Sequence, residues 1–162
     1  INTSKLEKIS INAKNIFINN KYNSVFSKEN IEDKTKNPPI TIIQNWINGN
    51  IDSFGNQNKF KINILEASIF KTEIENDNKK KYAEKTIFLY EIYFLVEYEL
   101  FDDNDFLLAN ATVETSRSTT SKKYISLNEG EMIINILLND ALKDFTKESK
   151  SMINLYMSEY IK

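Results

Sequence analysis

The sequence predicts an α+β fold, a two-layer sandwich in which a four-stranded, mostly antiparallel sheet carries two helices on one face, in the order β-α-β-β-β-α. Two observations predict it. Four segments alternate apolar and polar residues and two show helical spacing, while the last helix, at ~1.5 Å per residue, matches strands of about twelve to fourteen residues at ~3.3 Å each. The 162 residues suit one domain, 1–162, frayed at 1–6 and 158–162.

The first strand is expected within residues 7–19. Ile9, Ile11 and Ala13 alternate, and the apolar phase then shifts to Ile16, which indicates a bulge or bend near Asn15. A long polar loop follows over residues 20–37. The apolar residues expected to hold this loop against the body are Tyr22, Val25, Phe26 and Ile31.

The first helix is expected after Asn37-Pro38-Pro39, with Asn37 as the N-cap and a proline at the first helical position. Gly55 is the expected C-terminal stop. Trp46 lies beside the apolar stripe and is therefore interpreted as a core anchor rather than a ligand contact. The stripe at helical spacing comprises Ile40, Ile43, Ile47, Ile51 and Phe54.

Three strands are expected over residues 60–74, with a phase change around Leu65, 86–100 and 106–118. The middle one carries a second, mixed face that includes Tyr93 and Leu95. A central strand covered mainly on one side would have this pattern, and so would a sheet whose second face meets a partner or an acyl chain. The structural interpretation is favoured, and Tyr93 and Leu95 are kept as candidate binding residues.

The last helix is expected from Asn128 to near Tyr160, and two N-terminal registers fit its start. In the first, Ser126 caps the helix and Glu129 completes a capping box. In the second, Asn128 is the cap. Both registers make this segment a helix start rather than a site.

Arg117 is the only arginine in the chain and falls in phase with the core-facing row of its strand, near the strand end. A planar group with five donors can hold carbonyls or a carboxylate bidentately, which lysine cannot do. The favoured role for Arg117 is a clamp on the connection to the last helix. The functional alternative is binding of an anionic ligand such as a lipid head group.

Composition excludes several function classes. The chain has no Cys and no His, which rules out thiol nucleophiles, His bases and zinc sites with nitrogen or sulfur ligands within it. A net charge of −2 without a basic face argues against nucleic-acid binding. The remaining enzyme alternatives, carboxylate catalysis by Glu91, Glu97 or Glu99 and a metal at 102–105, are disfavoured because solvation and turn chemistry explain those residues. We expect no enzyme activity and no cofactor.

The chain resembles small envelope lipoproteins of unknown function typical of alphaproteobacteria. Five segments in the same order carry the resemblance. The family has a histidine at the end of the first segment, where this chain has Asp33, so no role of that histidine can be assigned here. The matching residues are Asn30-Ile31-Glu32-Asp33 before Pro38-Pro39, then Trp46, then Glu66-Ala67-Ser68-Ile69, then Ser116-Arg117 with Thr120, and Ser126-Leu127-Asn128-Glu129-Gly130-Glu131.

The resemblance implies a lipidated cysteine upstream of Ile1 and a periplasmic protein anchored by lipid to the outer membrane. The expected role is noncatalytic binding of an envelope protein or lipid. The element order is also similar to that of lipoproteins in lipid and lipopolysaccharide transport, which implies an accessory component of such transport as the alternative.

Overall fold

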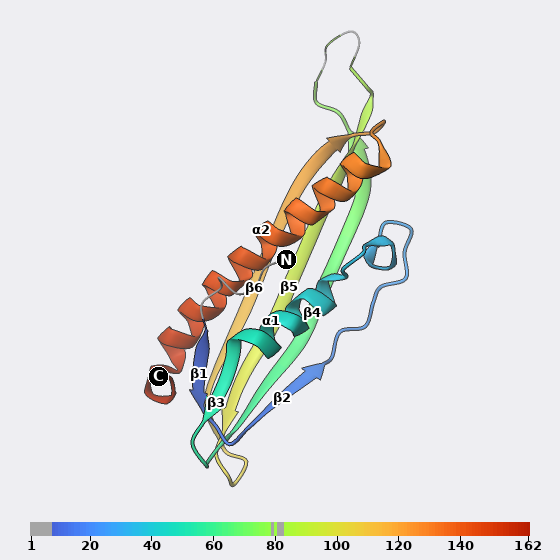
Figure 1. The fold of residues 1–162 in the computed structure, drawn as a ribbon. Helices are drawn as coiled ribbons and strands as arrows, with labels where there is room; N and C mark the ends of the chain where they lie inside the picture. The colour runs from blue at the N-terminus through green and yellow to red at the C-terminus, as the bar shows by residue number, and fades with distance from the viewer. Residues whose placement is uncertain (1–7, 79, 81–82) are drawn as a thin grey trace.

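The computed structural model describes residues 8–78, 80 and 83–162, so the expected fraying of 1–6 lies outside the described residues. It confirms the α+β fold: both helices pack on the same face of a four-stranded sheet (Figure 1). The elements in chain order are β1 (Ile9–Asn12), β2 (Asn15–Asn20), η2 (Glu32–Lys34), α1 (Pro39–Asn50), β3 (Ile51–Phe54), β4 (Lys59–Glu75), β5 (Thr86–Phe101), β6 (Leu107–Lys122), α2 (Leu127–Tyr156) and η3 (Ser158–Tyr160).

The main sheet has the strand order β2-β4-β5-β6. β4, β5 and β6 form an antiparallel meander as expected, and the phase change near Leu65 is a register shift between Ile64 and Glu66. β2 pairs with β4 in parallel. The reason is that α1 carries the chain back along the sheet between these two strands, so the sheet is mixed rather than uniformly antiparallel.

The expected first strand is two strands in different sheets. β1 pairs in parallel with β3 to form a separate two-stranded sheet, whereas β2 joins the main sheet. The change of apolar phase near Asn15 therefore marks a transfer between sheets rather than a bulge. Ile9, Ile11 and Ala13 of the first segment are all buried, which explains why its alternation is so regular.

The first helix ends earlier than predicted. α1 stops at Asn50, and Ile51 begins β3, which pairs with β1 in the register Ile9↔Ile51. Backbone pairing with β1 thus overrides the helical spacing of the apolar residues. Gly55, the predicted helix stop, instead turns the chain after β3 at φ +87°, where a Cβ would lie 2.4 Å from Asn12 Oδ1.

Asn37 does not cap α1. Pro38 occupies the N-cap position with Pro39 as the first helical residue, and no side chain bonds the free amides there. The Pro38 carbonyl accepts the Ile42 amide at 3.2 Å. The prediction placed the helix start one residue too early, because either proline of the pair satisfies the preference for proline in the first turn.

α2 begins in the first of the two registers. Ser126 is the N-cap, and its Oγ accepts the Glu129 amide at 3.1 Å. Asn128 lies inside the first turn and is not the cap. Within the described chain, the Glu129 carboxylate does not return a bond to the Ser126 amide, so the capping box is only half formed.

Replacing Ser126 with alanine should lower the free energy of unfolding by about 1 kcal/mol, because the Glu129 amide loses its acceptor. Asn128→Ala is the matched control and should change it by less than about 0.5 kcal/mol. Urea denaturation followed by circular dichroism measures both. An equal or larger loss in Asn128→Ala would contradict the observed register.

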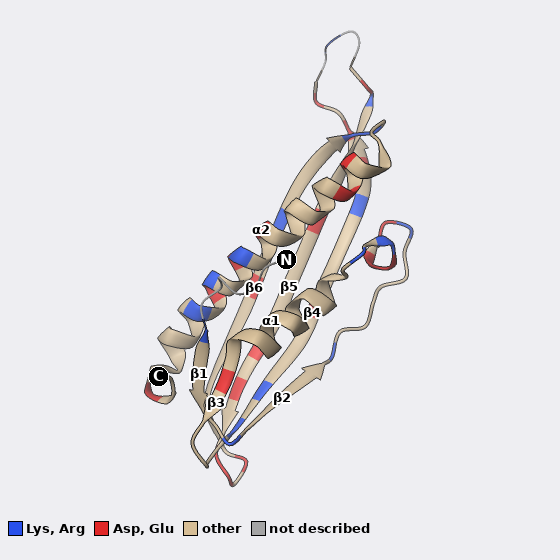
Figure 2. Ribbon diagram, in the orientation of Figure 1, with Lys and Arg blue, Asp and Glu red and all other residues tan. Residues whose placement is uncertain are grey.

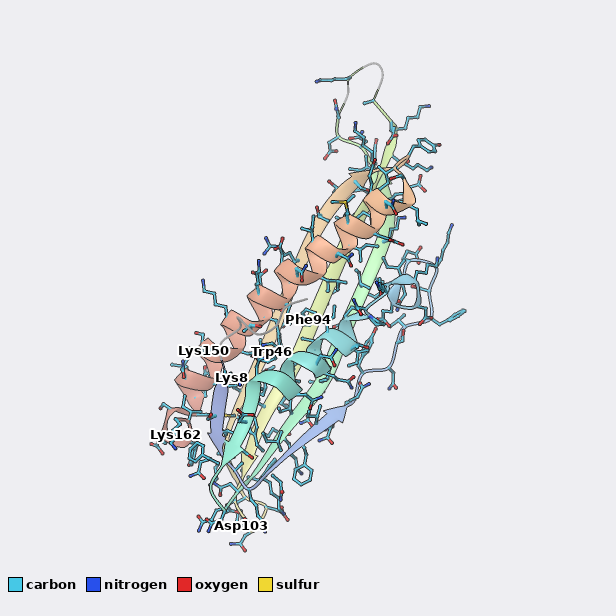
Figure 3. All side chains as sticks on the ribbon, viewed as in Figure 1. Lys8, Trp46, Phe94, Asp103, Lys150 and Lys162 are labelled. Atoms are coloured by element: carbon cyan, nitrogen blue, oxygen red, sulfur yellow. The ribbon has the colours of Figure 1, made fainter. Side chains whose placement is uncertain are left out.

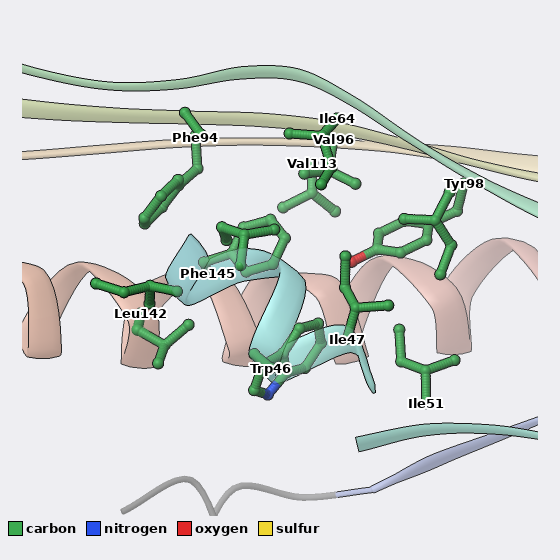
Figure 4. Close-up of a cluster of buried hydrophobic side chains, with 14 of the residues drawn as sticks. Trp46, Ile47, Ile51, Ile64, Phe94, Val96, Tyr98, Val113, Leu142 and Phe145 are labelled. Atoms are coloured by element: carbon green, nitrogen blue, oxygen red, sulfur yellow. The ribbon is translucent and has the colours of Figure 1, made fainter. Parts of the chain in front are cut away.

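Trp46 anchors the space between the helices and the sheet (Figure 3). It is fully buried and meets Phe145 of α2 edge to face at 5.5 Å between ring centroids, while Phe94 of β5 meets Phe145 at 5.6 Å (Figure 4). Aromatic side chains from both helices and the sheet thus meet in one core. The predicted role of Trp46 as a core residue is confirmed.

The chain end differs from the expected fraying of 158–162. Met157 is buried, η3 follows it, and Ile161 forms a bridge with Ile11 of β1. The Lys162 amide donates to the Ser10 carbonyl at 3.1 Å. The end of the chain therefore pairs with β1 as a third segment beside the two strands of the small sheet.

The segment between β2 and α1 is largely the predicted loop. Ile31 is buried and Asn30 bridges to Phe70 of β4, but Val25 and Phe26 are exposed rather than packed. The loop is held mainly by polar contacts and by this strand-like pairing with β4, which apolar residues alone did not reveal.

Candidate functional site

Arg117 reaches from β6 to the body of α2. Its Nη1 donates to Asp144 Oδ2 at 2.7 Å, and its Nη2 lies 4.0 Å from Asp140 Oδ2, one helical turn away. The hydrogen bond and charge of Asp144 raise the pKa of Arg117. The carboxylates that Arg117 holds belong to the helix itself and not to the connection before it, so this ion pair joins β6 to the middle of α2.

Arg117→Ala should lower the melting temperature only slightly, because the ion pair is solvent-exposed and exposed pairs contribute little. The decrease should vanish at about 1 M NaCl, where the Debye length is about 3 Å. Differential scanning calorimetry at low and high salt measures it. Asp144→Asn is the matched variant. The double variant, with both Arg117→Ala and Asp144→Asn, should have a melting temperature no lower than that of either single variant. A decrease equal to the sum of the two single decreases would contradict the pairing.

Tyr93 and Leu95 lie on the face of β5 that points away from both helices. Tyr93 Oη donates to Glu91 Oε2 at 2.6 Å, and this bond, followed by burial, raises the pKa of Tyr93 to about 12. Leu95 pairs across the sheet with Glu66 and Glu114. Both side chains are half-buried, although no helix covers this face.

The structure brings Arg117 and Tyr93 together. A hollow of about 410 Å³ at the β6 edge of the sheet is lined by Tyr93, Glu91, Arg117 and Asp144, with Ser116 and Ser118. The two candidate residues come from opposite faces of the sheet and meet only because β6 is its last strand. Leu95 lies further along β5, outside this hollow.

A polar ladder that the sequence did not reveal crosses three strands of the outer face. Asn63 is buried in β4, accepts from Asn19 Nδ2 at 3.0 Å, and donates through Nδ2 to Glu97 at 3.0 Å and Glu99 at 2.6 Å. The two carboxylates share one amide donor. Acid–base pairs rely on unlike environments, so this arrangement favours a structural ladder over paired-carboxylate catalysis.

A second cluster that periodicity did not reveal surrounds Glu32. This buried carboxylate accepts hydrogen bonds from the hydroxyls of Tyr22 and Ser24, the latter at 2.6 Å. Burial, and to a smaller extent the hydrogen bond to Glu32, raises the pKa of Tyr22 to about 12. The cluster closes the loop before α1, and its only sequence signal is the Asn30-Ile31-Glu32-Asp33 segment.

The acidic segment 102–105 is a turn. Asp102 Oδ1 accepts the amides of Asn104 at 2.8 Å and Phe106 at 2.9 Å, and Asp105 pairs with Lys59 at 2.9 Å. Asp103, labelled at one end of the molecule in Figure 3, accepts the Asn58 amide at 3.1 Å. Within the described part of the chain, no group of three or more acidic side chains is arranged to hold a metal ion.

Charges of both signs are interspersed over the strands and helices (Figure 2). Within residues 8–78, 80 and 83–162, no helix is both long enough and apolar enough to span a bilayer.

No family model matches the chain, and no curated protein matches it either. Among solved structures, it is similar to the crystal structure of a minor lipoprotein from Acinetobacter baumannii, with 12% identity and a TM-score of 0.49, over 90% of this chain and 93% of that chain. The resemblance to the alphaproteobacterial envelope lipoproteins stays a prediction from the sequence.

Proposed function

We propose that this chain is a noncatalytic binding domain of the cell envelope, held on the periplasmic side of the outer membrane by a lipid anchor upstream of Ile1. It binds a partner protein or a lipid through the outer face of its main sheet. The sequence resemblance supports the envelope location. The open face of the sheet supports the binding role.

The observation that carries the binding role is the uneven covering of the sheet. Both helices lie on one side, and the opposite face of β5 presents a row of half-buried apolar side chains. In a strand whose outer face only meets water, residues alternate between apolar on the inner face and polar on the outer face. The apolar members of this row are Ile87, Leu89, Tyr93, Leu95 and Phe101.

The carboxylates of this face are satisfied by neighbours within it. Glu91 accepts from Tyr93, and Glu97 and Glu99 accept from Asn63. A partner covering the face would therefore bury acceptors that already have donors, which reduces the cost of desolvating them. This supports a contact surface rather than a purely solvated one.

A photo-reactive benzoylphenylalanine at Leu95, introduced in the native cell, tests the face. We expect irradiation to give one discrete protein or lipid adduct, because Leu95 lies among the apolar residues of the face. The same group at exposed Asn154 of α2 is the control and should give none. Lipid adducts alone would favour the transport alternative, whereas equal yields at both positions would reject the face as a binding surface.

Mass spectrometry of the product of the whole gene tests the location. The expected result is a diacylglycerol-modified cysteine before Ile1 and recovery in the outer-membrane fraction. A cytoplasmic product without acylation would reject the envelope assignment. The crosslinking result would still test the binding face independently.

A further inference from the structure

The two edges of the main sheet are treated differently. On one side, β2 covers the first part of β4, and the loop then continues along it, with the Ile31 amide donating to the Ile69 carbonyl at 3.1 Å and the Lys71 amide to Glu29 at 2.8 Å. On the other side, β6 pairs with β5 alone. Among the described residues, no backbone group from outside the sheet bonds to the free edge of β6.

The free edge is long and carries few of the devices that prevent strand addition. β6 spans 16 residues, Leu107–Lys122, with no proline, and its only lysine is the last residue. Its register with β5 shifts once, between Leu100 and Phe101 at the start of β6, and is unbroken from Leu100 to Ile87. Monomeric sheets usually protect such edges with short strands, prolines, lysines, bulges or inward-pointing charges, and here Arg117 is the one charged side chain of β6 on the helix side. This edge can therefore accept another strand.

A strand added to β6 would find hollows on both of its faces. On the helix side, a hollow of about 240 Å³ between β6 and α2 has an apolar wall formed by Ile133, Ile136 and Leu137. Its other wall is polar, formed by Arg117, Ser118, Thr119 and Asp140. At the edge itself and toward the outer side lies the hollow of Glu91 and Tyr93, in which Arg117 is already paired with Asp144. Side chains of an added strand alternate between these sides. An apolar residue suits the first hollow, and a basic or hydroxyl residue suits the second.

A second copy of this chain fits the edge poorly. α2 packs chiefly over β6 and only secondarily over β5. If two copies paired antiparallel through β6, with both α2 helices on the same face, their strands would lie about 4.8 Å apart. Their α2 helices would then need nearly the same spacing, whereas packed helices lie about 8–10 Å apart. The occupant is therefore a segment without a helix of its own on that side.

We propose that the free edge of β6 binds an extended segment of another protein by strand addition, with apolar side chains toward Ile136 and basic or hydroxyl side chains toward Glu91. Main-chain hydrogen bonds would supply the affinity. The two hollows would select the side chains of the added segment and so determine specificity. This proposal does not depend on the envelope location or on binding through the outer face of β5.

An array of decapeptides in which Val, Ile or Leu alternates with Lys, Arg, Thr or Ser tests the proposal on the 162-residue chain. The best binder should protect amides of 107–122 from hydrogen exchange and leave those of 15–20 unchanged. Methylating alternate amides of that peptide should weaken binding at least about tenfold, since strand addition needs its N–H groups.

Ile136→Lys should weaken binding about as much as backbone methylation, because it places a charge on the apolar wall of the helix-side hollow. Leu155→Lys is the control, as it adds the same charge to another exposed apolar position of α2, and should bind normally. Absence of protection at 107–122, equal binding of the methylated peptide, or equal loss in both lysine variants would overturn the proposal. Protection that instead rises with protein concentration would assign the edge to a second copy and overturn it too.

Discussion

Trp46→Ala is expected to lower the free energy of unfolding by about 3–5 kcal/mol, the largest effect of any single substitution considered. The indole is fully buried and packs edge to face on Phe145, which in turn contacts Phe94. Loss of the indole leaves a cavity at the place where both helices pack against the sheet. Because the change removes the only tryptophan, unfolding in urea is followed by circular dichroism.

Two further variants separate packing from other causes. Trp46→Phe keeps an aromatic ring and removes an indole N–H that has no partner among the described residues, so its loss should be clearly smaller. Leu155→Ala changes an exposed residue and should stay within about 0.5 kcal/mol. A loss below about 1 kcal/mol for Trp46→Ala would contradict the central position of this ring.

Raising the pH above about 10 should unfold the protein within a few pH units. Tyr98 is buried with its hydroxyl 2.9 Å from Ser149 Oγ, and burial raises its pKa well above the usual range. Its phenol keeps its proton in the folded chain and loses it in the unfolded chain near pH ~10. Stability is therefore intact below that pH and falls as pH rises, by about 1.4 kcal/mol per unit for this one group.

Tyr22 and Tyr93, whose pKa values are raised to about 12, should add smaller contributions of the same sign because water reaches both rings. Urea melts between about pH 9 and 12 would measure the slope. Tyr98→Phe is the matched variant: it should lose about 1 kcal/mol at neutral pH and flatten the alkaline slope. An unchanged slope would show that Tyr98 does not control the transition.

The sequence predicted the meander and the last helix well because local patterns specify them. Buried residues of β5 alternate from Tyr90 to Leu100, and the extra residue near Leu65 shifts the phase of β4 where expected. The helical spacing of α2 and the cap at Ser126 also depend on neighbours within a few residues. Such patterns are set by which side chains avoid water, and in these elements the tertiary structure agrees with them.

The candidate site was predicted only in part. The sequence named Arg117 and Tyr93 as separate candidates and did not indicate that they would line one hollow or that Asp140 and Asp144 would face Arg117. Asn63 was missed because a buried asparagine in a strand has no periodic signal until the strands beside it are known. Its partners come from two different neighbouring strands.

By itself, the sequence determined the two-layer fold, the four long elements from β4 to α2, and the burial of Trp46. Only the tertiary structure decided that residues 7–19 divide between two sheets, that Ile51–Phe54 leaves its helical pattern to pair with β1, and that β6 is the unprotected edge. The reason is physical: periodicity records how a segment meets water, whereas strand pairing depends on backbone partners distant in the sequence, which compete with and can override local preference.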